Sequence, residues 1–175
     1  MSASTNTGVK SNKQIKLLVF TGLFTAIIYV LTAFLHVPTI KGYVHIGDGI
    51  IFLAASVLPT PYAVFAAAVG GALSDALSGY WIWVPATLII KGLTALFFTS
   101  KKPTILNVRN FIALIPALIL CVGGYGLYSG IFIYGNLVAG FADAIPNVLQ
   151  IATSAVLYII LGFALDKLHF KNKLN

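Results

Sequence analysis

The stretch that decides the interpretation of this chain is GGALSDALSGYWIWVPATLIIK, residues Gly70–Lys91. It begins as an apolar helix, passes through a short aromatic turn and continues as a second apolar helix. Each predicted helix carries one ionisable residue, Asp75 before the turn and Lys91 after it. At about 1.5 Å of rise per residue, Asp75 lies roughly 7 Å before Tyr80 and Lys91 roughly 10 Å past Val84. The two opposite charges are therefore expected at a similar depth in the same layer.

The composition of the chain indicates that this layer is a lipid bilayer. Of the 175 residues, 59% are hydrophobic and only 9% are charged, whereas about a quarter of the residues of a soluble domain are charged. The mean hydropathy is +0.96. So few charges do not cover a globule of this size in water, and the remaining surface is expected to face lipid. The apolar runs are continuous and do not alternate with polar residues, which favours membrane helices over a closed barrel.

Six apolar segments fit a single membrane bundle, at residues 15–35, 49–58, 62–78, 84–99, 111–134 and 141–165. We therefore predict an all-α protein with six transmembrane helices over residues 13–168. Residues 1–12 are expected to form a disordered cytoplasmic tail, because they are rich in Ser, Thr and Asn, and residues 169–175 a basic cytoplasmic tail. The second segment is short for a span, so we expect it to be tilted or partly buried.

The alternative is five spans, with the uncharged residues 49–74 merged into one kinked helix. Six spans place nine basic residues on one side of the membrane, beside the ends of apolar runs. Five spans would move Lys101, Lys102 and Arg109 to the opposite side. Basic loops stay preferentially in the cytoplasm, so the distribution favours six spans with both termini inside. The net charge of +7 thus indicates membrane flanks and not nucleic-acid binding.

Ionisable residues inside a bilayer are costly and are candidates for function. Asp75 and Lys91 form the clearest pair. They are interpreted either as a buried ion pair that locks the third helix to the fourth, or as groups that contact a ligand. The sequence leaves both interpretations open.

The sixth predicted helix carries a polar stripe at positions i, i+4, i+7 and i+11: Asp143, Asn147, Gln150 and Ser154. This spacing places the four side chains on one helix face, from the outer surface to about mid-bilayer. We favour a ligand-facing role over hydrogen bonds between helices. On the fifth helix, Tyr125 and Tyr128 are interpreted as interfacial anchors or as rings that stack on a flat heterocycle.

Other kinds of site find little support in the sequence. The histidines and Asp48 of the first loop match no metal-ligand spacing, and Cys121 is the only cysteine, which excludes an intrachain disulfide. The chain has neither an arranged catalytic set nor a Walker A motif. We therefore predict no catalytic activity, no metal and no cofactor. On the first helix, Gly22 and Ala26 form a small-residue face that permits close helix approach.

Three segments together resemble the S component of an energy-coupling factor (ECF) vitamin transporter. They are YVHIGDGIIFLAA at Tyr43–Ala55, GGALSD at Gly70–Asp75 and PATLIIKG at Pro85–Gly92, of which the last two are similar to the riboflavin-transporter-like branch. The resemblance implies a substrate-binding subunit, without catalytic activity, in the bacterial cytoplasmic membrane. It also implies partners, a transmembrane T protein and two ATPases, with which the S component topples to carry its ligand inward. Where the family has an A-x-x-x-A docking face, this chain has Gly22 and Ala26.

The resemblance also implies a ligand site near the outer face, built from the first loop and helices four to six. The matching positions are Tyr43, His45, Asp48, Lys91, Tyr125, Tyr128, Asp143, Asn147 and Gln150. We favour pyridoxine or hydroxymethylpyrimidine as the ligand, because the polar stripe suits hydroxyl and ring-nitrogen groups; riboflavin comes next, since its ribityl chain needs more polar partners. The alternative function is a self-sufficient secondary transporter, in which Asp75, Lys91 and Asp143 relay protons.

Overall fold

The computed structural model describes the backbone of residues 4–39, 43–142 and 144–174, and the side chains of residues 12–39, 43–142 and 144–172. The first half of the chain contains α1 (Ser4–Phe34), β1 (His36–Pro38), β2 (Tyr43–His45), α2 (Asp48–Val57), α3 (Thr60–Leu77), η1 (Trp81–Trp83) and α4 (Val84–Phe97). The second half contains α5 (Val108–Ile112), α6 (Leu114–Ile119), η2 (Leu120–Gly124), α7 (Tyr125–Ser129), η3 (Gly130–Tyr134), α8 (Leu137–Gly140), α9 (Ala144–Lys167) and α10 (Phe170–Leu174).

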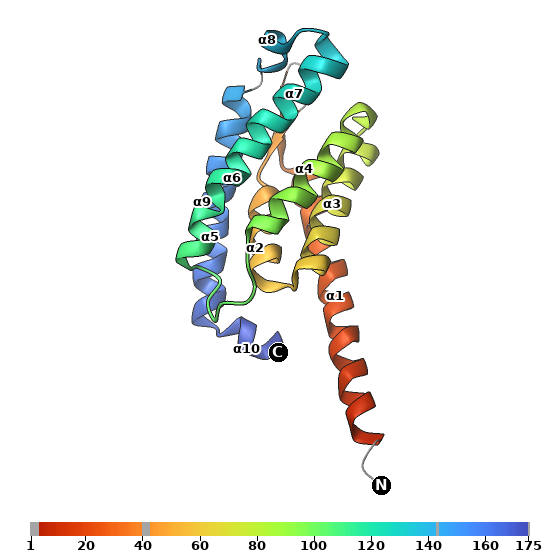
Figure 1. The fold of residues 1–175 in the computed structure, drawn as a ribbon, viewed down its shortest axis with the longest axis vertical. Coiled ribbons are helices and arrows are strands. Elements are labelled where there is room, and N and C mark those ends of the chain that lie inside the picture. The colour runs from red at the N-terminus through yellow and green to blue at the C-terminus, as the bar shows by residue number, and fades with distance from the viewer. Residues whose placement is uncertain (1–3, 40–42, 143, 175) are drawn as a thin grey trace.

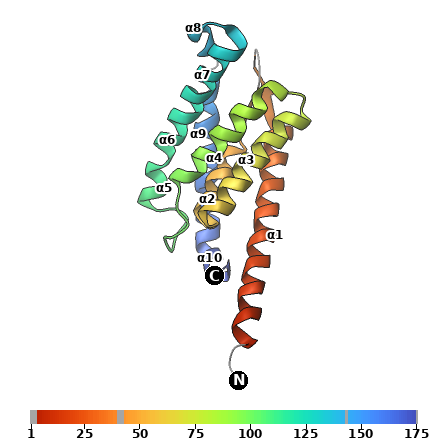
Figure 2. The ribbon, with the colours of Figure 1, turned by 45° about the vertical axis from the view of Figure 1, so that its right-hand side comes forward.

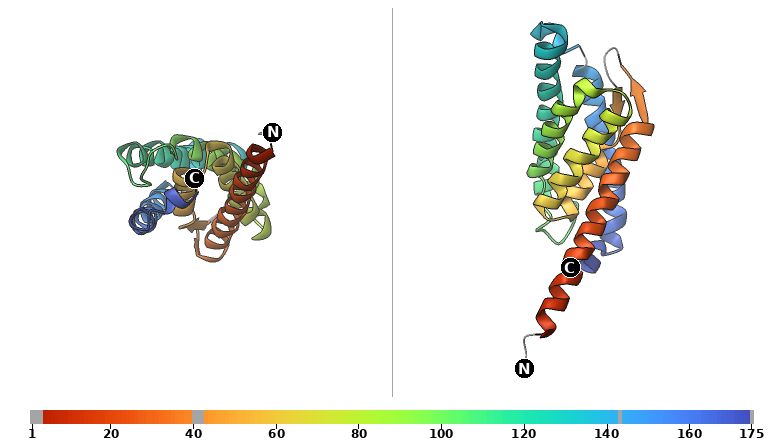
Figure 3. Two further views of the ribbon diagram at one scale, coloured as in Figure 1. Left: turned by 90° about the horizontal axis from the view of Figure 1, so that it is seen from below. Right: turned by 90° about the vertical axis from the view of Figure 1, so that its right-hand side faces the viewer.

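The helices form one elongated bundle, in which the start of α1 and helix α10 lie at one end and α8 at the other (Figure 1). Helix α3 packs against both α1 and α4, and these three lie side by side in Figure 2. Segments α5 to η3 follow one another as a long rod beside α9. The first part of α1 extends beyond the rest of the bundle (Figure 3, right).

The short helix α2 lies at the centre of the bundle and packs against α1, α3, α4 and α9. All ten of its residues are buried. Ten residues span about 15 Å, half of the roughly 30 Å of a bilayer's hydrocarbon core. A helix that is apolar on every side is stable only when other helices surround it. The segment was expected to be tilted or partly buried, and the structure shows it completely buried.

Glycines allow two of these helix contacts to be close. A Cβ on Gly70 would lie 2.9 Å from the side chain of Ile28, where α3 crosses α1. A Cβ on Gly49 would lie 2.6 Å from the backbone oxygen of Ser154, where α2 meets α9. Both helix pairs pack at a separation that a larger residue would not permit.

The structure differs from the sequence prediction in three places. The first loop is a two-stranded antiparallel hairpin, with His36 opposite His45, so the bundle is not purely α-helical. The fifth helix contains two π-helical turns, η2 and η3. Helix α1 begins at Ser4, within the segment that was expected to be disordered. In contrast, α2, α3 and α4 lie within two residues of their predicted bounds.

Among the residues that the structure describes, three helical stretches are long and apolar enough to cross a membrane: Asn12–Phe34, Val108–Tyr134 and Leu137–Lys167. Helix α2 and the stretch Trp81–Phe97 are apolar but shorter. The count of six spans and the orientation of the termini thus stay predictions. Lys41 lies outside the described residues.

The loop between α4 and α5 is fastened at the end where α1 begins. Asn110 is fully buried, and its Oδ1 accepts from the backbone N–H of Thr99 at 2.9 Å. Both carboxylate oxygens of Asp166 accept from loop N–H groups, those of Ile105 and Leu106, at 2.7 and 2.9 Å. Lys171 donates to the Ser100 carbonyl at 2.8 Å. The α4–α5 loop, which carries basic residues, is therefore held in place by hydrogen bonds to α5, α9 and α10.

Candidate ligand site

A pocket of about 520 Å³, including the space at its mouth, opens between the hairpin and helices α1, α3, α4, α7 and α9. The hairpin lies in the upper half of the bundle, away from α10 (Figure 3, right). The residues that line the pocket are Thr32, Thr39, Tyr43, Val44, His45, Asp75, Trp83, Thr87, Tyr125, Asn147 and Gln150.

Lys91 and Asp48 form a buried ion pair that does not line the pocket. The Lys91 Nζ lies 2.7 Å from Asp48 Oδ1 and donates to Oδ2 at 2.9 Å. Each residue is only 1% exposed. Gly71 makes room for the lysine stem, since a Cβ there would lie 3.1 Å from Lys91 Cγ. The two charges compensate each other. The ion pair contacts two lining residues, Gln150 and Tyr125.

This pairing corrects the prediction that Lys91 pairs with Asp75. Lys91 points from α4 toward the central helix α2, which begins at Asp48. Asp75 instead accepts a hydrogen bond from the Tyr43 hydroxyl at 2.6 Å. Equal depth along neighbouring helices does not establish which side chains face each other. The prediction that Asp48 and Lys91 bind substrate is likewise not matched by the pocket lining.

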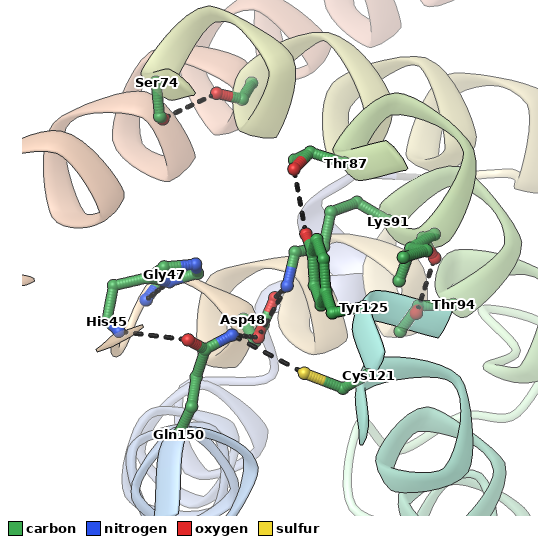
Figure 4. A network of polar contacts seen from close by, with 12 residues as sticks. His45, Gly47, Asp48, Ser74, Thr87, Lys91, Thr94, Cys121, Tyr125 and Gln150 are labelled. Atoms are coloured by element: carbon green, nitrogen blue, oxygen red, sulfur yellow. Dashed lines mark hydrogen bonds and ion pairs between the residues drawn. The ribbon is translucent and has the colours of Figure 1, made fainter. Parts of the chain in front are cut away.

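Gln150 joins the hairpin to the buried ion pair (Figure 4). Its Nε2 donates to Asp48 Oδ2 at 2.7 Å, and its Oε1 accepts from the backbone N–H of His45 at 3.2 Å. Cys121 Sγ lies 3.7 Å from the same Nε2. The amide is therefore oriented at both ends by protein groups, although Gln150 also lines the pocket.

The polar stripe of the sixth helix is divided among different surroundings. Asn147 lines the pocket with Gln150. Ser154 is fully buried on α9, whose backbone meets Gly49 of α2 at that residue, and it is not part of the lining. Asp143 lies outside the described residues. The ligand-facing interpretation thus fits Asn147 best.

His45 lines the pocket with a neutral ring. Its Nδ1 accepts from the backbone N–H of Gly47 at 3.1 Å, which leaves the ring proton on Nε2. Burial lowers the pKa of His45 to about 3. The imidazole therefore carries no charge at physiological pH.

Two buried oxygen atoms of the pocket have no hydrogen-bond partner among the described residues. They are Asp75 Oδ2 and Thr32 Oγ1, on side chains that are 5% and 2% exposed. Buried polar atoms in native proteins are nearly always paired. Both atoms belong to residues that line the pocket.

Aromatic rings form one wall of the pocket. The rings of Trp83 and Tyr125 lie 5.8 Å apart in an edge-to-face arrangement. The Tyr125 hydroxyl shares a hydrogen bond of 2.9 Å with Thr87 Oγ1, and Lys91 Nζ lies 5.2 Å from the centre of the Tyr125 ring. This cation–π contact links the wall to the buried ion pair.

Tyr128 does not line the pocket, although its ring lies 5.8 Å from that of Trp83. Its hydroxyl donates to the Ile82 carbonyl, and its ring packs against Phe132, with centroids 4.9 Å apart. The interpretation as an anchor therefore fits Tyr128, and the interpretation as a ligand-facing ring fits Tyr125. Trp83, in the aromatic turn between α3 and α4, is only 9% exposed and lines the pocket, whereas Trp81 is 67% exposed.

The sequence analysis missed four lining residues: Thr32, Thr39, Val44 and Thr87. The position of Thr87 in the pocket could have been predicted, because Thr87 precedes Lys91 by four positions and thus shares its helix face. Thr32 similarly continues the face of Thr21 and Thr25 on α1. Thr39 and Val44 belong to the short hairpin, which has no periodicity to read.

Gly22 and Ala26 are both exposed on α1. A Cβ on Gly22 would meet nothing within 4 Å. They lie in a stripe of exposed residues that also includes Ile15, Leu18, Val19, Leu23 and Val30. We call these seven residues the α1 stripe.

Comparison with known proteins identifies the family of this bundle. A family model described as ECF-type riboflavin transporter, S component, matches residues 12–167. The matched region contains every residue that lines the pocket. The family is one of substrate-binding subunits of vitamin transporters in membranes and is not an enzyme family. No curated protein matches the chain significantly. Among the described residues, no group of three or more potential ligand side chains could hold a metal ion.

Proposed function

The chain belongs to the family of ECF-type riboflavin transporter S components, and we propose that it captures a compact heterocyclic vitamin or precursor in the pocket described above. Pyridoxine or hydroxymethylpyrimidine is the favoured ligand, and riboflavin comes second. The observation that carries this proposal is the pairing of an aromatic wall with two unpartnered buried oxygens in one pocket. Flat rings stack on such walls, while polar groups fix their orientation.

The number of available polar groups supports a compact ligand. Asp48, Lys91 and Gln150 are bonded to one another and are not available to a long polar chain. The lining offers Asp75, Asn147 and several hydroxyls. A heterocycle with one or two hydroxymethyl groups matches this set, whereas a ribityl chain needs more partners.

We further propose six spans with both termini in the cytoplasm. Three long apolar stretches and a central short helix are consistent with this topology. The start of α1, the α4–α5 loop, the start of α5 and helix α10 lie at the same end of the bundle (Figure 1). These segments carry most of the basic residues. Since basic segments stay inside, the pocket would open toward the exterior of a bacterial cytoplasmic membrane.

The partners in this proposal are a transmembrane T protein and two ATPases. The α1 stripe is the proposed docking face for the T protein. Its small residues at Gly22 and Ala26 leave open space on the surface, which permits a partner helix to approach closely.

Ligand titration followed by tryptophan fluorescence tests the proposed site. Of the two tryptophans, Trp83 lines the pocket and Trp81 is exposed. Hydroxymethylpyrimidine, pyridoxine and riboflavin are titrated into detergent-purified protein. We expect a saturable fluorescence change that persists in Trp81→Phe and is lost in Trp83→Phe. A change that follows Trp81 instead, or no binding of any of the three compounds, would contradict the proposal.

A second experiment separates this function from that of a secondary transporter. The purified chain alone, in liposomes with a proton gradient, is expected to move no substrate. Uptake without a T protein and ATPases would favour the alternative.

A further inference from the structure

The charge of the pocket has a single source among the described residues that line it. Among the described lining residues, Asp75 is the one acidic side chain, there is no lysine or arginine, and His45 is neutral. The nearby charges of Asp48 and Lys91 cancel each other in their ion pair. Asp75 is thus the one carboxyl group that the described lining offers to a ligand.

The orientation of this carboxylate is set by the hairpin. Tyr43 donates to Oδ1 at 2.6 Å, and Oδ2 has no hydrogen-bond partner among the described residues. The side chain is 5% exposed, so water supports it poorly. An unpartnered, buried carboxylate oxygen is strongly unfavourable unless a donor reaches it.

We propose that Asp75 selects ligands that present an amino group or a protonated ring nitrogen. Such a nitrogen would donate a charge-assisted hydrogen bond to Oδ2. The rings of Tyr43, Trp83 and Tyr125 line the same pocket, and their negative faces favour a cation. A ring edge that carries carbonyl oxygens would instead face the carboxylate with acceptors. This inference rests on the proposed function, because it assumes that the pocket binds a heterocycle.

The second unpartnered oxygen extends the requirement. Thr32 Oγ1 both donates and accepts, so a ligand hydroxyl suits it. A ring with a donating nitrogen and a separate hydroxyl therefore matches both atoms. Hydroxymethylpyrimidine meets the requirement with an amino group that has no carbonyl beside it, whereas the ring N–H of riboflavin lies between two carbonyl oxygens that would be brought close to the carboxylate.

The test compares two probes that differ in one group. Hydroxymethylpyrimidine and the same pyrimidine with a methyl group in place of the amino group are titrated calorimetrically into the purified full chain. We expect the amino compound to bind at least about tenfold more tightly, as a hydrogen bond to a charged group predicts. Equal affinities would overturn the inference but leave the proposed function intact. If neither probe binds, and neither pyridoxine nor riboflavin binds, both the inference and the proposed function are overturned.

Variants assign the preference to Asp75. Asp75→Asn is expected to bring the two affinities within about threefold, whereas Asp75→Glu keeps the order of preference. The control Asn147→Ala lines the same pocket and is expected to weaken both probes without removing the preference. A preference that survives Asp75→Asn would overturn the inference. If Asp75→Asn does not fold, Asp75→Ser takes its place. A loss of the preference in Asp75→Ser together with its retention in Asn147→Ala supports the assignment to this carboxylate, and its retention in Asp75→Ser overturns it.

Discussion

Replacement of Lys91 by methionine tests the buried ion pair beneath the pocket. Met preserves most of the side-chain volume but leaves Asp48, which is 1% exposed, without its countercharge. Removal of one partner of a buried pair costs about 3–5 kcal/mol. For a chain of this length each kcal/mol corresponds to about 2–4 °C in Tm, so we expect Tm to fall by roughly 6–20 °C.

The chain provides its own reporter for this measurement. Cys121 is the only cysteine and is buried, so a thiol-reactive fluorophore labels it when the bundle unfolds. The matched control is Lys102→Met, at an exposed position of the α4–α5 loop. We expect the control to change stability by less than about 0.5 kcal/mol.

A double-mutant cycle identifies the partner of Lys91. The variant Asp48→Asn combined with Lys91→Met is expected to be more stable than additivity predicts, with a coupling of about 1–3 kcal/mol. The cycle of Lys91→Met with Asp75→Asn should give a smaller coupling. If the Asp75 coupling equals or exceeds that of Asp48, the pairing described above is wrong.

Three further predictions concern other parts of the bundle. Gly22→Leu fills the open surface of the α1 stripe, so uptake in cells with the T protein and ATPases is expected to be lost while ligand titration of the pure protein is unchanged; normal uptake would refute the docking face. Gly49→Ala places a Cβ against the Ser154 carbonyl and should destabilise by about 1–3 kcal/mol, measured as Tm against Ala26→Gly on the exposed surface. The pKa of His45 is about 3 in the folded chain because of burial, so below pH 6.5 only the unfolded state takes up this proton. Stability should then fall by about 2 kcal/mol between pH 6.5 and 5, and a His45→Gln variant with the same pH dependence would count against this origin.

The helices were the part of the fold that the sequence predicted best. Helices α2, α3 and α4 have bounds close to prediction because apolar runs end at Pro59, Pro61 and the aromatic turn. The hairpin was missed, since strands of three residues are too short to show alternation. The π-helical turns of the fifth helix were also missed. Each adds one residue to a turn without changing composition, and the first places Tyr125 directly after it.

The site was predicted in part, for a related reason. Tyr43, His45, Tyr125, Asn147 and Gln150 line the pocket as expected. Depth along a helix can be read from residue number, but the neighbour that a side chain faces depends on how helices cross. For that reason Lys91 was paired with Asp75, although the central position of α2 brings Asp48 to it. The same limit concealed Thr32 and Thr87.

Mass spectrometry of the small molecules that co-purify with the full chain tests the central claim most directly. The account predicts one heterocyclic vitamin or precursor with an amino or protonatable ring nitrogen, retained by the unmodified chain and by Trp81→Phe. The same compound should be depleted from Asp75→Asn and from Asn147→Ala, which alter the pocket lining. A compound without a heterocycle, or one retained equally by all four proteins, would contradict the account.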